Sequence, residues 1–169
     1  MASSCGEIKV FMQVFVMRHG QATMAAPTDA LRPLTESGIK EAEIMGQWLH
    51  DNHCEFDAIF VSPYLRAQQT ADALMTRLGH VSKRETLAII TPEDSPKHVH
   101  DYLDATCSAN VKNILFVSHM PLVSYLVAEL TSDNAMPIFQ TASIAQIEYD
   151  TSKMQGELIT LVSPNEIEC

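Results

Sequence analysis

The chain has 169 residues, of which 46% are hydrophobic, and these values suit one globular domain with a full hydrophobic core. Its formal charge of −10 argues against a broad nucleic-acid or acidic-membrane surface, because such partners reward clustered basic side chains. No apolar run approaches the roughly 20 residues of a membrane-spanning helix, and Glu7 and Lys9 interrupt the start where a signal peptide needs an apolar block, so we expect a cytoplasmic protein.

A single domain is predicted over residues 12–164. Residues 1–11 precede Met12, which stands before the first apolar run as a natural start would, so they form an N-terminal extension of native or foreign origin. Residues 165–169 are predicted to be a C-terminal tail. The cysteines are far apart and without a C-x-x-C pair, so we expect incidental thiols rather than a zinc site or a disulfide framework: Cys5, Cys54, Cys107 and Cys169.

The first predicted strand is the apolar run Val14-Phe15-Val16, and Met17-Arg18-His19-Gly20 follows it directly. This order places a cation and an imidazole at the carboxyl end of a strand. An unprotonated imidazole at such a turn is a nucleophile that can attack phosphorus.

Two helices with start signals follow. Thr35 is a suitable N-cap for a helix over residues 36–51. Its inner face, with Trp48 on the flank, is predicted to be Ile39, Ala42, Met45 and Leu49. A strand over residues 58–61 then runs into Ser62-Pro63, which open a helix with Arg66 in its first turn and Gly79 as its stop. The inner face of this second helix is predicted to be Ala67, Ala71, Leu74 and Leu78.

The second half of the chain continues the alternation. Residues 86–90 are β-prone, and residues 95–106 fit a helix with Val99, Tyr102 and Leu103 inward. The run 114–117 predicts a strand that ends in Ser118-His119, and Pro121 opens a helix. The inner face of that helix is predicted to be Leu122, Tyr125, Leu126 and Leu130. Two more strands are expected near 142–149 and 157–162.

Strands that alternate with helices predict an α/β fold with a mostly parallel central sheet and helices on both faces. Ligands of such sheets bind in the crevice outside the carboxyl ends of the strands. The turns that carry Arg18, His19, Arg66 and His119 all fall on that edge.

Three motifs in this order resemble those of the histidine phosphatase superfamily: Arg18-His19-Gly20, Ser62-Pro63 with Arg66-Ala67 and Thr70-Ala71, and Ser118-His119. R-H-G alone arises often by chance, whereas three ordered motifs on strand-to-helix turns are specific. Within the superfamily the likeness is to the small bacterial phosphohistidine phosphatases of the SixA type. It covers nearly everything from Met12 to Pro164 and includes Arg32-Pro33-Leu34-Thr35.

The resemblance implies a phosphoglycerate-mutase-like fold, no cofactor, and His19 as a nucleophile that becomes phosphorylated. Chemistry requires a neutral His19, so we expect one ring nitrogen to donate to a carbonyl while the other faces phosphorus. The resemblance also implies that Arg18 and Arg66 hold the phosphoryl oxygens through paired guanidinium donors. His119 is expected to be protonated and to donate to the same oxygens.

A general acid is where the sequence departs from the family. Many relatives carry Asp or Glu after the second histidine, where Met120 stands here. Other relatives carry the acid after the third strand, and Glu93 and Asp94 are the only acids near that position here. Glu93 is therefore a possible general acid, and its alternative is a solvated turn residue.

No metal site is predicted. His98 and His100 would share a face only on a strand, and on the predicted helix we expect them to diverge. The remaining histidines belong to a helix end or a loop, namely His50, His53 and His80.

The lid over the site is expected to be minimal, because only residues 21–34 separate the R-H-G turn from the next helix cap. A shallow site suits a phosphoryl group carried on a protein, whereas a metabolite gains more from enclosure. The resemblance implies a phosphorylated protein substrate, such as a histidine-containing phosphotransfer domain or a phosphocarrier protein. The alternatives are a metabolite phosphomonoesterase or mutase, which the short lid disfavours, and a phosphoprotein-binding module, which the intact Arg and His set disfavours.

Overall fold

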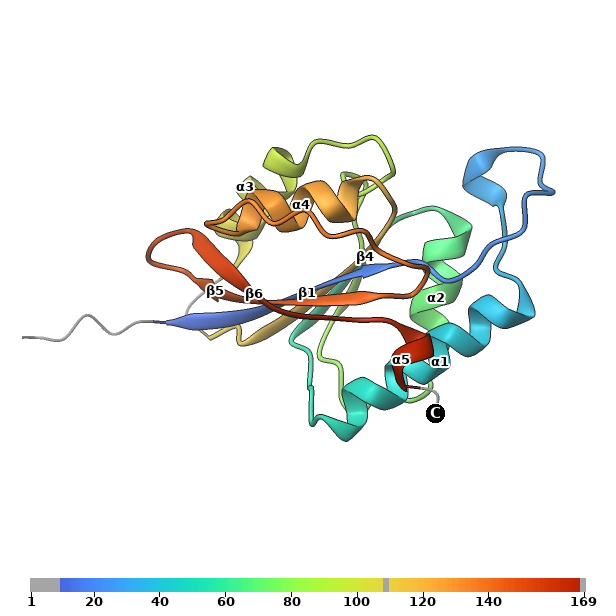
Figure 1. Ribbon diagram of the computed structural model, residues 1–169, viewed down its shortest axis with the longest axis horizontal. Coiled ribbons are helices and arrows are strands. Elements are labelled where there is room, and N and C mark those ends of the chain that lie inside the picture. Colours follow the sequence, from blue (N-terminus) through green and yellow to red (C-terminus); the bar gives the residue numbers. More distant parts are fainter. Residues whose placement is uncertain (1–9, 108–109, 168–169) are drawn as a thin grey trace, which may run out of the picture.

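A six-stranded mixed sheet forms the centre of the computed structural model, which describes residues 10–107 and 110–167 (Figure 1). The strands are β1 (Phe11–Arg18), β2 (Ala58–Val61), β3 (Arg84–Thr86), β4 (Asn113–Ser118), β5 (Ile144–Asp150) and β6 (Gln155–Val162). Their order across the sheet is β3-β2-β4-β1-β5-β6. The first four in that order are parallel, and β5 and β6 add an antiparallel end. The predicted α/β domain with a mostly parallel sheet is confirmed.

Helices cover both faces of the sheet, as expected (Figure 1). They are α1 (Glu36–Asp51), α2 (Leu65–Met75), α3 (Pro96–Thr106), α4 (Leu122–Leu130) and the short α5 (Pro164–Ile167). Alternate side chains of β1 divide the core: Val14 and Val16 pack with α3 and α4, whereas Phe15 and Met17 pack with α1 and α2. β2 and β4 have helices on both faces and are almost wholly buried. None of the described helices is long and apolar enough to cross a membrane.

The helix predicted over residues 36–51 is confirmed at both ends. The hydroxyl of Thr35 accepts the backbone N–H of Gly38 at 3.0 Å, which is the expected N-cap. The inner face was predicted correctly except for Ile39, which is 40% exposed. In α4, Tyr125 is likewise exposed instead of inward, because the buried face is completed by Val123 and Val127.

Two other element predictions were partly wrong. α2 starts at Leu65, after the Ser62-Pro63 pair, and ends at Met75 rather than near Gly79, because Thr76 and Arg77 form a tight turn back to the helix. The strand predicted over 86–90 is β3, at Arg84–Thr86. The apolar residues that follow β3, Leu87 and Ile90, are buried in a loop that packs against the side of the sheet covered by α3 and α4.

The predicted domain limits, 12–164, stay a prediction. β1 begins at Phe11, inside the predicted extension, and α5 occupies part of the predicted tail. Cys5 and Cys169 lie outside the described residues. Cys54 and Cys107 are half-buried free thiols, and burial raises the pKa of each, so they carry little of the reactive thiolate.

Candidate active site

The carboxyl ends of β1, β2 and β4 bring the three motif turns together. Arg18 at the end of β1 pairs with Ser118 at the end of β4. The backbone N–H of His19 donates to the Ser118 carbonyl at 3.0 Å, and that of Ser62 donates to the Val117 carbonyl at 3.0 Å. These contacts join the turns at neighbouring positions along the sheet edge. Arg18, His19, Arg66 and His119 therefore gather at one place, as the sequence predicted.

The imidazole of His19 has a defined tautomer. Its Nδ1 lies 2.7 Å from the carbonyl oxygen of Gly20, which can only accept, so Nδ1 carries the proton. Nε2 is therefore unprotonated, and its lone pair accepts a hydrogen bond from Nε of Arg66 at 3.3 Å. Burial lowers the pKa of His19 to about 4, and the charges of Arg66 and Arg18 act in the same direction. The ring is therefore neutral at physiological pH.

The turn after His19 is held from two sides. The backbone N–H of Gly20 donates to the hydroxyl of Thr70 at 3.0 Å, and that hydroxyl donates to the Arg66 carbonyl at 2.7 Å. On the other side the turn touches the start of α1, where a Cβ on Gly20 would lie 2.5 Å from the Gly38 carbonyl oxygen. A Cβ on Gly38 would in turn lie 2.1 Å from the Gln21 carbonyl oxygen. Both positions require glycine because backbone approaches backbone there.

The two predicted arginines differ in how far their donors are engaged. Arg18 donates through one terminal nitrogen to the Phe139 carbonyl at 2.8 Å, and its buried Nε has no hydrogen-bond partner among the described residues. Arg66 is 3% exposed, and the ring of Tyr64 lies 5.1 Å from its guanidinium carbon. Burial beside an aromatic face keeps the Arg66 guanidinium in one orientation.

The ring of His119 lies 5.1 Å from that of His19, centroid to centroid. Its Nε2 lies 2.7 Å from the hydroxyl of Ser62, while its buried Nδ1 has no partner among the described residues. Burial lowers the pKa of His119 to about 2, and the neighbouring His19 and Arg66 add to that effect. The expectation of a protonated His119 is thus wrong for the free protein, since burial among cations disfavours a further positive charge.

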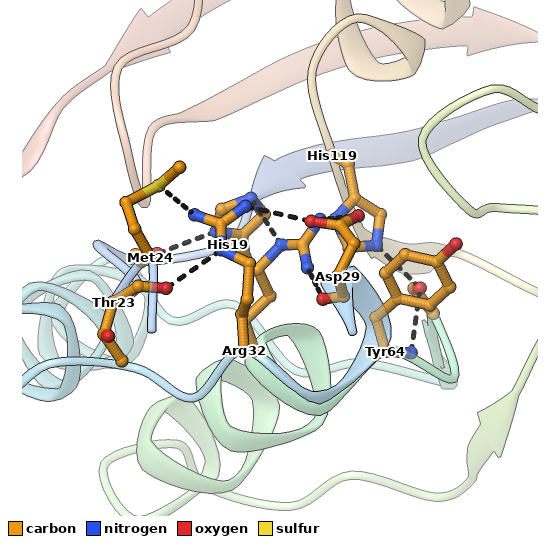
Figure 2. Close-up of polar contacts among 10 residues, drawn as sticks. His19, Thr23, Met24, Asp29, Arg32, Tyr64 and His119 are labelled. Carbon is orange, nitrogen blue, oxygen red and sulfur yellow. Dashed lines mark hydrogen bonds and ion pairs between the residues drawn. The ribbon is translucent and has the colours of Figure 1, made fainter. Parts of the chain in front are cut away.

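Sequence reasoning missed the contribution of the short loop before α1. Its 3₁₀ helix η1 (Asp29–Leu31) places Asp29 against two arginines. One carboxylate oxygen of Asp29 lies 3.2 Å from Arg66 and the other lies 3.1 Å from Arg32. In the view of Figure 2, Asp29 lies between His19 and His119, with Arg32 beside His19. The only signal in the sequence was the Arg32-Pro33-Leu34-Thr35 run, which we had used for the helix cap.

The possible general acid Glu93 is not among the side chains that gather here. Glu93 is exposed in the loop before α3, and its carboxylate makes no hydrogen bond or ion pair with the described residues. Its neighbour Asp94 caps the loop by accepting from the backbone N–H and hydroxyl of Thr91. Met120 is half-buried, and its sulfur accepts from the hydroxyl of Ser124 at 3.1 Å.

The other histidines lie away from these side chains. His98 is exposed on α3, whereas His100 is half-buried between Glu129 and Tyr149, so the two diverge as expected. Across residues 10–107 and 110–167, no three His, Cys, Asp or Glu side chains are grouped so as to hold a metal ion.

Comparison with known proteins agrees with this geometry. The family model of the histidine phosphatase superfamily (branch 1) matches residues 14–88. The phosphohistidine phosphatase SixA of Escherichia coli (strain K12) is 42% identical over 141 residues, which are 83% of this chain and 88% of that protein. The chain belongs to the histidine phosphatase superfamily.

Solved structures of the superfamily extend the agreement to the fold. The structure of the protein histidine phosphatase SixA complexed with tungstate has a TM-score of 0.88 and 40% identity, with 92% of this chain and 99% of that one covered. A phosphoglycerate mutase from Bacillus anthracis has a TM-score of 0.67 at 17% identity, with 95% and 96% covered. This second likeness concerns the fold alone, and it confirms the mutase-like architecture.

Proposed function

We propose that this chain is a protein phosphohistidine phosphatase that works through a phosphohistidine on His19. The tautomer of His19 carries the proposal: Nδ1–H donates to the Gly20 carbonyl, so Nε2 presents a lone pair at the sheet edge. A pKa of about 4 keeps that lone pair unprotonated at neutral pH. Identity to SixA over most of both chains supports the same activity.

The reaction has two transfers. Nε2 of His19 forms a bond to phosphorus while the P–N bond of the substrate breaks, and the substrate imidazole, protonated on its other nitrogen, leaves as a neutral ring. Nδ1 keeps its own proton, which is hydrogen-bonded to the Gly20 carbonyl, so phosphorylated His19 also leaves as a neutral ring and is an equally good leaving group. Water then attacks phosphorus, the Nε2 lone pair is restored, and inorganic phosphate and a proton are released.

Arg18, Arg66 and His119 hold the phosphoryl oxygens in this proposal. Nε of Arg18 and Nδ1 of His119 are buried and unpartnered in the described part of the chain, which leaves both for a ligand. The hydroxyl of Ser62 accepts the backbone N–H of Tyr64 at 3.3 Å, so we infer that its own proton points to Nε2 of His119. His119 then carries its proton on Nδ1 and donates to an oxygen as a neutral imidazole.

The surroundings of the site support a phosphoprotein substrate. Arg32 donates to the sulfur of Met24, which is 81% exposed, and Arg18 donates to the carbonyl that follows Ile138, which is 83% exposed. Exposed large apolar side chains thus lie beside these arginines, namely Met24, Leu31 and Ile138. Such a rim favours a protein surface over a small polar metabolite. We infer a histidine-containing phosphotransfer domain or a phosphocarrier protein in the cytoplasm as partner.

A comparison of substrates tests the function. The enzyme is offered a phosphohistidine protein, p-nitrophenyl phosphate, phosphoserine and a sugar phosphate, with and without a chelator. Without a positioned acid, alkyl phosphates should react roughly 10²–10⁴-fold more slowly than phosphohistidine, because general acid catalysis is commonly worth that much. The chelator should change nothing. Equal rates on phosphohistidine and a sugar phosphate would favour the metabolite enzyme, and binding without turnover would favour the docking module.

A further inference from the structure

All three nitrogen groups of the Arg66 guanidinium are engaged. Nε donates to Nε2 of His19 at 3.3 Å, and the two terminal nitrogens donate to the Asp29 backbone carbonyl at 2.7 Å and to the Asp29 carboxylate at 3.2 Å. Arg66 directs one N–H of each nitrogen to these acceptors, so phosphoryl oxygens that bind those same N–H groups beside His19 compete with Asp29. In the view of Figure 2, Asp29 lies between the two imidazoles, on the side of Arg66 that faces His19.

The Asp29 carboxylate also forms an ion pair with a second arginine, Arg32. Its other oxygen accepts from Arg32 at 3.1 Å, and the Asp29 side chain is 56% exposed. Hydrogen bonds from Arg32 and Arg66 lower the pKa of Asp29, so it is ionised at neutral pH. Asp29 also raises the pKa of His119, against the larger effects that lower it, which places its charge within reach of that imidazole. Asp29 can thus leave Arg66 and still be paired.

The ends of the loop are fixed independently of Asp29. The backbone N–H of Thr23 donates to the Pro33 carbonyl at 2.9 Å, and that of Leu34 donates to the side chain of Gln69 at 2.7 Å. Residues 27–29 between them are exposed. A small shift of η1 would separate Asp29 from Arg66 without breaking the contacts that close the loop.

We propose that Asp29 is a displaceable counter-ion of Arg66. It holds the guanidinium in line with His19 before the substrate binds, yields Arg66 to the phosphoryl oxygens while it stays on Arg32, and returns as inorganic phosphate leaves. This role rests on the proposed function to the extent that an oxyanion binds at Arg66. It makes Asp29 a residue that limits oxyanion affinity and promotes product release.

Asp29→Asn tests the role, because it keeps the shape of the side chain and removes the charge. Calorimetry would measure binding of tungstate and of inorganic phosphate to the intact chain. Both should bind roughly two- to fivefold more tightly to the variant, the scale of a partly exposed ion pair. Inorganic phosphate should become a stronger product inhibitor of phosphohistidine hydrolysis by a similar factor.

Asp72→Asn is the matched control. Asp72 pairs with Arg84 at 2.6 Å in a partly exposed ion pair similar to that of Asp29 with Arg32, and its loss changes the net charge equally. The control should leave oxyanion binding unchanged. Equal tightening in both variants would reduce the effect to net charge and overturn the proposal.

Two results with folded Asp29→Asn protein would also overturn it. Unchanged affinity means that Asp29 does not compete, and weaker affinity means that Asp29 only positions Arg66. Asp29→Ala, checked by thermal unfolding, repeats the test without the amide. Since binding needs no turnover, tighter tungstate binding in an inactive enzyme would refute the phosphatase and retain the counter-ion. Failure of tungstate to bind either protein would refute both.

Discussion

Two histidine clusters lie at opposite edges of the sheet. At the carboxyl edge, arginines lie near His19 and His119, and neither ring makes a hydrogen bond to a carboxylate in the described residues. At the amino edge, near the start of β1, His100 lies 3.1 Å from Glu129 through Nδ1. Its Nε2 lies 2.9 Å from the hydroxyl of Tyr149 and 3.3 Å from Asp104. Tyr149 lies at that edge because it pairs with Met12, the second residue of β1.

The contrast shows how neighbours assign a role to the same side chain. Cations and burial keep an imidazole neutral, so it retains an unprotonated nitrogen that can attack phosphorus. Carboxylates engage both nitrogens of His100 and leave none for a substrate, so that cluster ties α3 to α4 and β5. A histidine count cannot separate the two cases, whereas the sign of the neighbouring charges can.

The substitution with the largest expected effect on the carboxyl edge is His19→Ala. Turnover of phosphohistidine protein should fall by at least about 10⁴-fold, because the nucleophile is gone. Thermal unfolding should stay cooperative, since His19 lies on a turn outside the hydrophobic core clusters. Acid-quenched, base-stable labelling of the protein by substrate should disappear as well. Substantial hydrolysis by folded His19→Ala protein would refute the covalent route.

Arg66→Lys tests the shape of the cation at the same edge. A lysine keeps the charge but not the fork that contacts His19 and Asp29 together. We expect kcat/KM to fall by roughly 10²-fold, the usual cost of a lost oxyanion donor. Arg77→Lys, in an exposed pair with Glu43, should remain fully active. If Arg66→Lys is equally active, positive charge alone suffices and the fork has no role.

The pH dependence of stability tests whether His19 is neutral in the folded protein. His19 takes up a proton near pH 6.5 when unfolded but only near pH 4 when folded. Between those values the unfolded state binds more protons, so stability falls as the pH falls. The wild type should lose roughly 3 kcal/mol more than His19→Ala between pH 7 and pH 4. Denaturant unfolding at several pH values measures this, and parallel curves would place a charged His19 in the folded state.

The smallest expected effect is that of Glu129→Gln at the amino edge. Removal of the partly exposed partner of His100 should lower the free energy of unfolding by about 1 kcal/mol. Turnover should stay within about twofold, because this edge contacts no phosphoryl group. Urea unfolding and steady-state kinetics on one preparation measure both. A tenfold loss of turnover without unfolding would show that the two edges are coupled.

Local signals predicted much of this architecture. The helix predicted over roughly 36–51 is confirmed, and its start was predictable because Thr35 makes the local N-cap contact with Gly38. The meeting of Arg18, Arg66 and His119 followed from a general property of parallel sheets, whose carboxyl strand ends share one edge. The strand predicted at 86–90 lies at Arg84–Thr86 instead. Leu87 and Ile90 are buried equally well in the loop that follows it, so their apolar character did not require a strand.

The long-range polar contacts of the site could not be predicted from the sequence. Asp29 reaches Arg66 across 37 positions and Ser62 reaches His119 across 57, and neither pair has a periodic signal. The charge on His119 was also predicted wrongly, since its pKa depends on burial and on several neighbours at once. Glu93 was proposed only as a possible acid, and its exposed position fits the alternative of a solvated turn residue.

The backbone contact between Gly20 and Gly38 has a consequence for engineering. Gly38 lies 19 positions after His19 and on a different element, yet any Cβ there would push against the Gln21 carbonyl, two positions after the nucleophile. In a saturation library selected for phosphatase activity, Gly38 should be as intolerant as the catalytic motif while its variants still fold. Libraries built to alter substrate choice should therefore leave this glycine fixed and vary the exposed rim, where the backbone imposes no such limit.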